Sequence, residues 1–148
     1  MLEKNIVVVD MDGTIADGNH RLHHLYPKEK RNWDAFYAEC DQDTPHEDVI
    51  CMVNALKEAG HTIVILTGRR EETRKETQRW LEHYSVYYDL LIMRPVGFHG
   101  DDHLWKPDML SLLGGTMNIM MVIEDRNRIV TALRQQGYRV IQVADGDF

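Results

Sequence analysis

The stretch NIVVVDMDGT occupies residues 5–14. Residues 5–10 are short, β-branched and continuously apolar up to Asp10, which is typical of a strand covered on both faces of a parallel sheet. Gly13 then lets the backbone turn sharply, so that Asp10 and Asp12 stand at the exposed end of the strand. The stretch therefore predicts a central strand that ends in two carboxylates.

Further apolar segments are predicted as buried strands, at residues 61–67, 90–93, 118–124 and 138–143. Helical patterns are found between them, at residues 71–83, 106–113 and 126–136 and in the segment before Gly60. Strands that alternate with helices predict right-handed crossovers and an open parallel sheet flanked by helices. The expected fold class is α/β, with ligands at the carboxyl ends of the strands.

The clearest helix signal precedes Gly60. Thr44 is a favourable N-cap, Pro45 suits the first helical position, and Glu47 is the acid of a capping box. Apolar residues then recur at helical spacing as far as Gly60. We therefore expect a helix that begins at Pro45 and ends before Gly60.

The chain has 148 residues, with 17 Lys and Arg against 24 Asp and Glu, and a net charge of −7. This length favours a single domain over residues 1–148, in which residues 15–44 form a small cap-like insertion with room for one or two short helices. The acidic balance argues against indiscriminate coating of nucleic acid.

The apolar runs are far below the roughly 18 residues of a membrane span, and the first residues lack the features of a signal peptide. We therefore expect a cytoplasmic protein without membrane contact.

Two predicted strand ends carry groups suited to phosphate chemistry. Asp10 and Asp12 repel each other unless a cation joins them, and Mg²⁺ prefers such oxygen ligands. Thr67 and Gly68 follow the second strand, where a hydroxyl and backbone N–H groups can cradle a phosphate. Thr67 could instead cap the helix that follows it.

Two further groups could complete this site. Glu124 and Asp125 end another predicted strand and could join Asp10 in a metal site, or simply begin an acidic helix. Lys106 could pair with a phosphoryl oxygen and hold the carboxylates together, or lie at the surface.

Taken in chain order, the two aspartates after the first strand, the Thr67 strand end, Lys106 and the final acid pair resemble the motifs of the haloacid dehalogenase superfamily of phosphotransferases. Its motifs read DxDGT, then a strand-end Thr or Ser, then Lys, then a paired acid, and the match extends as far as Asp125. The resemblance implies a Rossmann-like fold with a minimal cap. It implies that Asp10 attacks phosphorus and becomes an aspartyl phosphate, with Asp12 as general acid and base. Thr67 and Lys106 would be the other catalytic residues.

The same resemblance implies Mg²⁺ as cofactor. Asp10 and Asp125 would bind the ion through their carboxylates and Asp12 through its main-chain carbonyl. Glu124 would either bind the ion directly or support another ligand, and we favour Asp125 as the direct ligand of the pair.

A closer resemblance lies in residues 12–21 and 142–148, which look like the 3′-phosphatase domain of phage polynucleotide kinase/phosphatase. That domain has arginines at the positions of Arg21 and Arg69, which implies that these two side chains hold the substrate phosphate or the nearby backbone. The resemblance implies removal of 3′-phosphates from polynucleotide ends. Similar motifs occur in 5′(3′)-deoxyribonucleotidases, so mononucleotides are the alternative substrates.

The sequence differs from that family in two respects. A phosphate-binding loop of the form GxxxxGK[ST] does not occur in it, so we expect any 5′-kinase activity to belong to another chain. A separate kinase or ligase is thus a candidate partner. Glu124 stands where the family has aspartate. A phosphate-binding module without catalysis would be marked by loss of Asp10 or Asp12, and both are present.

Basic residues are concentrated in residues 19–33 and 69–79. The first segment could follow the backbone of a nucleic-acid strand. For the second we expect a solvated helix face, with arginines paired to glutamates at helical spacing.

Two groups of side chains in the insertion have a structural interpretation. Trp33, Phe36 and Tyr37 could stack on bases, but their helical spacing is more typical of core residues. His20, His23 and His24 are interpreted as part of a surface loop rather than as zinc ligands.

Overall fold

The computed structural model describes residues 3–148. Its main sheet has five parallel strands in the order β5-β4-β1-β6-β7. These strands are β1 (Ile6–Val9), β4 (Thr62–Arg70), β5 (Leu90–Arg94), β6 (Ile119–Glu124) and β7 (Val140–Gln142). All five predicted strands are confirmed, and β1 is the central one.

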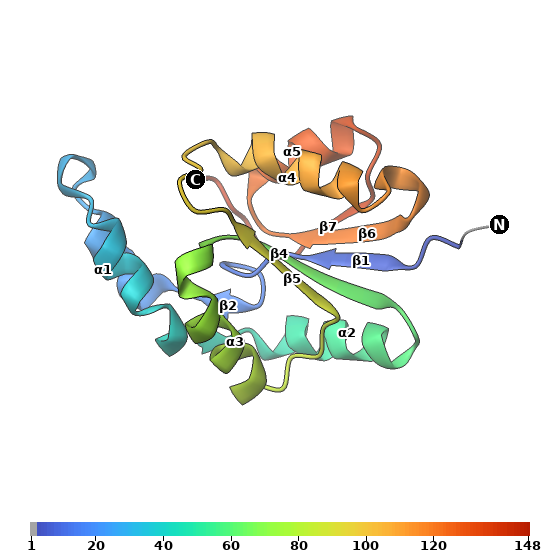
Figure 1. Ribbon diagram of the computed structural model, residues 1–148, viewed down its shortest axis with the longest axis horizontal. Coiled ribbons are helices and arrows are strands. Elements are labelled where there is room, and N and C mark those ends of the chain that lie inside the picture. Colours follow the sequence, from blue (N-terminus) through green and yellow to red (C-terminus); the bar gives the residue numbers. More distant parts are fainter. Residues whose placement is uncertain (1–2) are drawn as a thin grey trace.

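Helices cover both faces of the sheet (Figure 1). They are α2 (Glu47–Glu58), α3 (Arg74–His83), α4 (Asp102–Leu112) and α5 (Asn127–Gln135). In Figure 1, α2 and α3 lie below the sheet, whereas α4 and α5 lie above it. The predicted α/β fold with a parallel sheet flanked by helices is therefore confirmed.

The alternation of side chains along β1 explains its continuously apolar sequence. Val7 and Val9 pack in the core cluster that includes residues of α2 and α3, whereas Val8 packs with residues of α4 and α5. All three are at most 1% exposed. Burial of such a side chain contributes about 1.5–3 kcal/mol relative to exposure, so both faces of β1 stabilise the fold.

The predicted start of α2 was wrong. Thr44–Pro45 is a short strand, β3, that pairs antiparallel with β2 (Ala16–Asp17). The His46 N–H continues this connection by donating to the Ile15 carbonyl (2.8 Å), and α2 begins only at Glu47. Tertiary pairing with β2 therefore keeps the chain extended where the local capping signals favour a helix.

Other element boundaries also differ from the prediction. β4 continues to Arg70 and is followed by the 3₁₀ turn η4 (Glu71–Thr73) before α3 begins. Thr67 therefore lies inside a strand, which excludes its alternative role as a helix cap. α4 begins at Asp102 rather than at Lys106, so that Lys106 lies within the helix.

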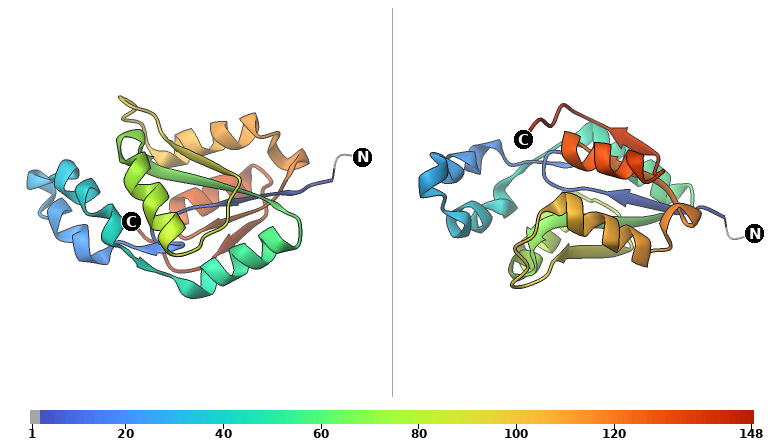
Figure 2. Two further views of the ribbon diagram at one scale, coloured as in Figure 1. Left: turned by 60° about the horizontal axis from the view of Figure 1, so that its bottom comes forward. Right: turned by 90° about the horizontal axis from the view of Figure 1, so that it is seen from above.

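The segment between β2 and β3 contains four short helical elements rather than the predicted one or two. They are η1 (Asn19–Leu25), η2 (Lys28–Lys30), α1 (Trp33–Ala38) and η3 (Cys40–Gln42). We call residues 18–43 the cap segment. It projects beyond the carboxyl ends of the strands (Figures 1 and 2). Among residues 3–148, no helix has the length and apolar character that crossing a bilayer requires.

Candidate active site

A tight turn follows β1 and fixes the two aspartates. The N–H groups of residues 14–16 converge on the Met11 carbonyl, at 2.9–3.1 Å. Gly13 has a φ of +82°, and a Cβ placed there would lie 2.1 Å from Oδ2 of Asp125. Only glycine therefore allows β1 and β6 to bring Asp10 and Asp125 to one place.

Asp10, Glu124 and Asp125 form what we call the acidic cluster, and all three are buried. Lys106 Nζ donates to Asp10 Oδ1 (2.7 Å) and to Glu124 Oε2 (2.9 Å). The Thr14 hydroxyl lies 3.2 Å from Asp10 Oδ2 and 3.2 Å from Asp125 Oδ1, and its single proton serves one of them at a time. The acidic cluster is thus joined by one ammonium group and one hydroxyl.

The two aspartates of the acidic cluster and Lys106 have shifted pKa values. Burial and the charge of Glu124 raise the pKa of Asp10 to about 7. Burial and the charge of Asp10 raise the pKa of Asp125 to about 6. Burial by itself would lower the pKa of Lys106, but Asp10 and Glu124 raise it. Lys106 therefore stays charged, and the acidic cluster has more negative charge than its neighbours neutralise.

The acidic cluster fits a divalent metal ion. Each of its three residues offers a carboxylate oxygen, and these oxygens lie within 4.8 Å of one another. Hard oxygen ligands with excess negative charge suit Mg²⁺. Within residues 3–148 no other group of three or more His, Cys, Asp and Glu side chains has this spacing.

Asp12 belongs to a second group, the arginine cluster, which consists of Asp12, Arg21, Asp43 and Arg69. Asp12 Oδ1 accepts hydrogen bonds from Arg21 Nη2 (3.0 Å) and from Arg69 Nη2 (2.8 Å) and Nε (3.0 Å). Asp43 Oδ2 accepts from the same two Nη2 atoms, at 2.8 and 2.7 Å. Two carboxylates therefore balance two guanidinium groups.

The cap segment and α3 hold the arginine cluster in place. Arg21 lies over the Phe36 ring, 4.1 Å from its centroid, and its Nε donates to Asp43 Oδ1 (2.8 Å). The Trp80 indole N–H donates to the Asp43 carbonyl (2.7 Å). Arg21, Asp43 and Arg69 are all 0% exposed, so α1, η3, β4 and α3 together enclose the cluster.

The arginines control the ionisation of Asp12. Burial by itself would raise the pKa of this carboxyl, but Arg69 and Arg21 lower it below its ordinary value. The Asp12 side chain is nevertheless 37% exposed, unlike those of the two arginines. Asp12 is therefore an ionised group that is held from within the protein and open to a ligand from outside.

Arg21 and Arg69 are predicted from the sequence as substrate-binding residues. In the structure both guanidinium groups are inaccessible to solvent and are bonded to Asp12 and Asp43. Both arginines therefore contact Asp12, the predicted general acid and base. Their contact with substrate stays a prediction.

Thr67 and Gly68 lie at the end of β4. Thr67 is buried, and its Oγ1 accepts the N–H of Arg69 (3.1 Å). A Cβ at Gly68 would lie 2.4 Å from Asp102 Oδ2, so the backbone there approaches α4 closely. Arg94 donates to the Gly68 carbonyl (3.2 Å) and forms an ion pair with Asp102.

Asp43, Asp102 and Arg94 were not singled out by the sequence analysis. Arg94 could have been found, because it directly follows the strand predicted at residues 90–93 and so lies near the same sheet edge as Thr67. Asp102 precedes Lys106 by about one helical turn, a spacing that becomes informative only once α4 is known to begin there. Nothing in the local sequence marks Asp43.

The C-terminal residues fix the turn after β6. Gln142 Nε2 donates to the Asp125 carbonyl (2.9 Å), and the Asn127 N–H donates to the Gly146 carbonyl (2.8 Å). A Cβ at Gly146 would lie 2.2 Å from the Asp125 carbonyl oxygen. The tail therefore packs directly against the turn that carries Asp125.

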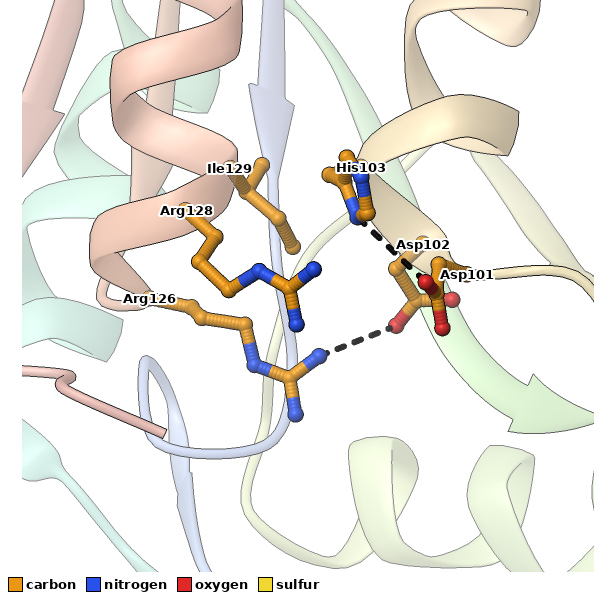
Figure 3. Close-up of a pocket in the computed structure, with 6 residues that line it drawn as sticks. All are labelled: Asp101, Asp102, His103, Arg126, Arg128 and Ile129. Atoms are coloured by element: carbon orange, nitrogen blue, oxygen red, sulfur yellow. Dashed lines mark ion pairs between the residues drawn. The ribbon is translucent and has the colours of Figure 1, made fainter.

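A small polar pocket of about 30 Å³ lies beside this site, between the starts of α4 and α5 (Figure 3). Arg126 faces Asp102 across it, with Nη1 and Oδ2 3.8 Å apart. Pockets for small molecules have volumes of roughly 300–1,000 Å³, and this pocket has room for about one water. This pocket is therefore too small to enclose a nucleotide.

Comparison with solved structures found close overall similarity to chains of two Pnkp1/Rnl/Hen1 complexes. Both have TM-scores of 0.81 and 26% identity, and they cover 97% and 98% of this chain. This chain spans 44% and 47% of those chains. A class C acid phosphatase from Bacillus anthracis has a TM-score of 0.70 and 16% identity, covering 97% of this chain and 67% of its own. A comparison with curated proteins found no match.

An L-2-haloacid dehalogenase from Xanthobacter autotrophicus has a TM-score of 0.64 and 14% identity, covering 95% of this chain and 78% of its own. This similarity confirms the haloacid dehalogenase fold that the motifs imply. The model of one family, described as the polynucleotide kinase PNKP phosphatase domain, matches residues 4–148, and the chain therefore belongs to that family of phosphatase domains.

Proposed function

We propose that this protein is a Mg²⁺-dependent phosphomonoesterase that works through an aspartyl phosphate and removes 3′-phosphates from polynucleotide ends. The observation that carries the proposal is the contrast between the surroundings of Asp10 and Asp12, which lie in the same turn. Asp10 lies in an acidic cluster with surplus negative charge, and Asp12, two residues later, is bound by two arginines. This contrast supports metal-assisted attack by one carboxylate and proton transfer by the other.

In the first step, a carboxylate oxygen of Asp10 forms a bond to phosphorus while the bond from phosphorus to the ester oxygen breaks. Asp12 gives its proton to the departing oxygen. Lys106, bonded to Asp10 Oδ1, orients the nucleophile and offsets negative charge. The products of this step are the free 3′-hydroxyl and an aspartyl phosphate on Asp10.

In the second step, water attacks phosphorus and the bond to the Asp10 oxygen breaks, so that inorganic phosphate and the Asp10 carboxylate form. Asp12, now ionised, accepts a proton from the attacking water. The arginine cluster favours this ionised form. The enzyme thereby returns to its starting state.

The first step requires a proton on Asp12, although the arginines lower its pKa. A dianionic phosphate beside Asp12 acts in the opposite direction, because a nearby like charge disfavours the carboxylate. We therefore expect substrate binding to bring about protonation of Asp12, so that the same residue serves both steps.

Asp10, Glu124 and Asp125 would hold the metal ion, together with the main-chain carbonyl of Asp12. When bound, Mg²⁺ would neutralise charge on the transferred phosphoryl group and on the carboxylates around it. Thr67 and the backbone at Gly68 are the proposed contacts for the phosphoryl oxygens.

Polynucleotide ends are favoured over mononucleotides by the family to which the chain belongs and by its similarity to a chain of an RNA repair complex. The name of that complex also supports a partner with kinase or ligase activity.

The test is phosphate release in Mg²⁺ or EDTA from a 3′-phosphorylated oligonucleotide and from 3′- and 5′-mononucleotides. We expect Asp10-dependent release that EDTA abolishes, with the highest kcat/KM for the oligonucleotide. A higher kcat/KM for mononucleotides would make the protein a nucleotidase. Release that persists in Asp10→Asn would refute the assignment of the nucleophile.

A further inference from the structure

The cap segment carries aromatic side chains that the core does not need. Trp33, Phe36 and Tyr37 are all predicted from the sequence as core residues, but only Phe36 is buried. Trp33 is 39% exposed and Tyr37 is partly buried. Their two rings are stacked, with centroids 6.0 Å apart and an interplanar angle of 25°. The prediction was wrong for these two because the short helix α1 has only one face against the protein.

Each of these rings is accompanied by an arginine. The Arg31 guanidinium lies 5.8 Å from the centroid of Trp33, and that of Arg70 lies 4.9 Å from the centroid of Tyr37. We call these four residues the aromatic ladder. The two stacked rings lie between the two guanidinium groups, and aromatic surface combined with positive charge is typical of surfaces that bind single-stranded nucleic acid without regard to sequence.

The ladder begins at the candidate active site. Arg70 directly follows Arg69, whose guanidinium group is bonded to Asp12. The Tyr37 ring lies 5.3 Å from the ring of Phe36, and the Arg21 guanidinium of the arginine cluster lies over that Phe36 ring. From there the ladder runs along α1, which extends away from the sheet at its carboxyl edge (Figure 2).

The charge around the ladder also suits a phosphate backbone. Lys28 and Lys30 lie in η2, immediately before Arg31, and Glu29 is the one acid of that turn. Asp34 lies 3.2 Å from Arg70, but its side chain is 94% exposed, so this ion pair can exchange for a phosphate at little cost.

We propose that the aromatic ladder binds the last nucleotides of a single-stranded polynucleotide whose 3′-phosphate lies at Asp10, with Tyr37 nearest the terminal base and Trp33 beneath the preceding one. This inference rests on the proposed function and deepens it, because a mononucleotide has no second base to reach Trp33. Binding of this kind selects a strand end by its polymer nature rather than by its sequence.

The test compares kcat/KM for a 3′-phosphorylated single-stranded oligonucleotide with kcat/KM for a 3′-mononucleotide. In Trp33→Ala we expect the ratio of the two to fall by about tenfold or more, as is typical when a base loses its stacking partner. Trp33→Phe should restore most of the ratio. Making the second-last nucleotide abasic should lower the ratio of the wild type and leave that of Trp33→Ala almost unchanged.

Two control variants make the result specific. Tyr87 is also an exposed aromatic residue, just before β5 and away from the cap segment, and Tyr87→Ala should leave the ratio unchanged. Phe148 lies over Arg126 on the other side of the site, with Arg126 5.0 Å from its ring centroid. A fall of the ratio in Phe148→Ala but not in Trp33→Ala would overturn the proposal, because the strand would then leave by that side.

Failure of the ladder and failure of the phosphatase proposal give different results. An unchanged ratio in Trp33→Ala, with Asp10-dependent release intact, refutes the ladder alone. If the chain releases no phosphate, binding of the 3′-phosphorylated oligonucleotide to the wild type and its loss in Trp33→Ala still test the ladder.

Discussion

The acidic cluster and the arginine cluster meet at one turn of the chain but balance their charges in opposite ways. In the acidic cluster three carboxyl groups share one lysine, and the pKa values of Asp10 and Asp125 are raised. In the arginine cluster two carboxylates meet two guanidinium groups, and the pKa of Asp12 is lowered. The acidic cluster therefore has surplus negative charge that a cation would neutralise, whereas the arginine cluster is balanced and holds the Asp12 side chain.

The sharpest test of this contrast is Asp10→Asn. We expect kcat to fall by about 10⁴-fold or more, as for removal of other catalytic nucleophiles. Because the change removes a charge from a cluster with surplus negative charge, metal-free stability at neutral pH should be equal or higher. Phosphate release and thermal unfolding measure the two effects. A strongly destabilised Asp10→Asn protein would show that the acidic cluster is not under charge repulsion.

Asp43→Ala is expected to have the opposite effect on stability, since it should destabilise the fold. It leaves two buried guanidinium groups with one carboxylate, which typically costs about 3–5 kcal/mol of folding free energy. Activity should fall as well, because Arg21 and Arg69 would no longer hold Asp12 in one position. Denaturant unfolding measures the stability.

Asp41 provides a matched control for this substitution, since it lies in η3, which Asp43 directly follows, and is exposed. Asp41→Ala should change the free energy of unfolding by less than about 0.5 kcal/mol. Equal effects of the two substitutions would contradict the arginine cluster as described.

Removal of the Thr14 hydroxyl is expected to have a smaller effect on activity, because it weakens binding of the metal ion. It lies between Asp10 and Asp125, and loss of such a supporting hydrogen bond typically lowers metal affinity by about 10- to 100-fold. Thr14→Val should therefore need more Mg²⁺ for half-maximal activity, whereas Thr14→Ser should need nearly as little as the wild type. An unchanged Mg²⁺ requirement in Thr14→Val would place the ion away from these two carboxylates.

The smallest expected effect is the pH dependence of stability. The folded-state pKa values of Asp10 and Asp125, about 7 and about 6, exceed the ordinary value of 3.8, so the folded protein binds these protons more tightly than the unfolded chain does. Their contribution to metal-free stability is full below the ordinary value and is lost as the pH rises through 6 and 7.

Because Mg²⁺ binds the ionised carboxylates, it should raise Tm by several degrees more at about pH 8 than at about pH 5. Thermal unfolding with Mg²⁺ or EDTA at both values measures this difference. In Asp10→Asn the difference should shrink. A Mg²⁺ effect that is equal at both values would argue against binding at the acidic cluster.

The sequence predicts the framework of this molecule because the framework follows from local patterns. Short apolar runs predict the five strands, and parallel strands bring Asp10, Thr67 and Glu124 to one edge wherever the exact boundaries fall. Lys106 required the family resemblance, since an isolated lysine is usually a surface residue.

The parts that sequence reasoning missed depend on contacts between distant residues. Thr44–Pro45 has strong capping signals, yet pairing with β2 makes it a strand. The burial of Arg21 is not visible from its neighbours, because the partner that permits it is Asp43, 22 positions later. Trp33 and Tyr37 have helical spacing like that of core residues, but the projection of the cap segment leaves Trp33 exposed and Tyr37 only partly buried.

The central claim, that Asp10 carries the phosphoryl group, is tested most directly with Asp12→Asn and p-nitrophenyl phosphate. This substrate has a leaving group that departs without a proton, whereas the second step still needs the base. We predict a burst of one equivalent of nitrophenolate, slow turnover afterwards, and the added mass of one phosphoryl group on the peptide that contains Asp10. Steady turnover without a burst, or a phosphoryl group on any other residue, would contradict the account.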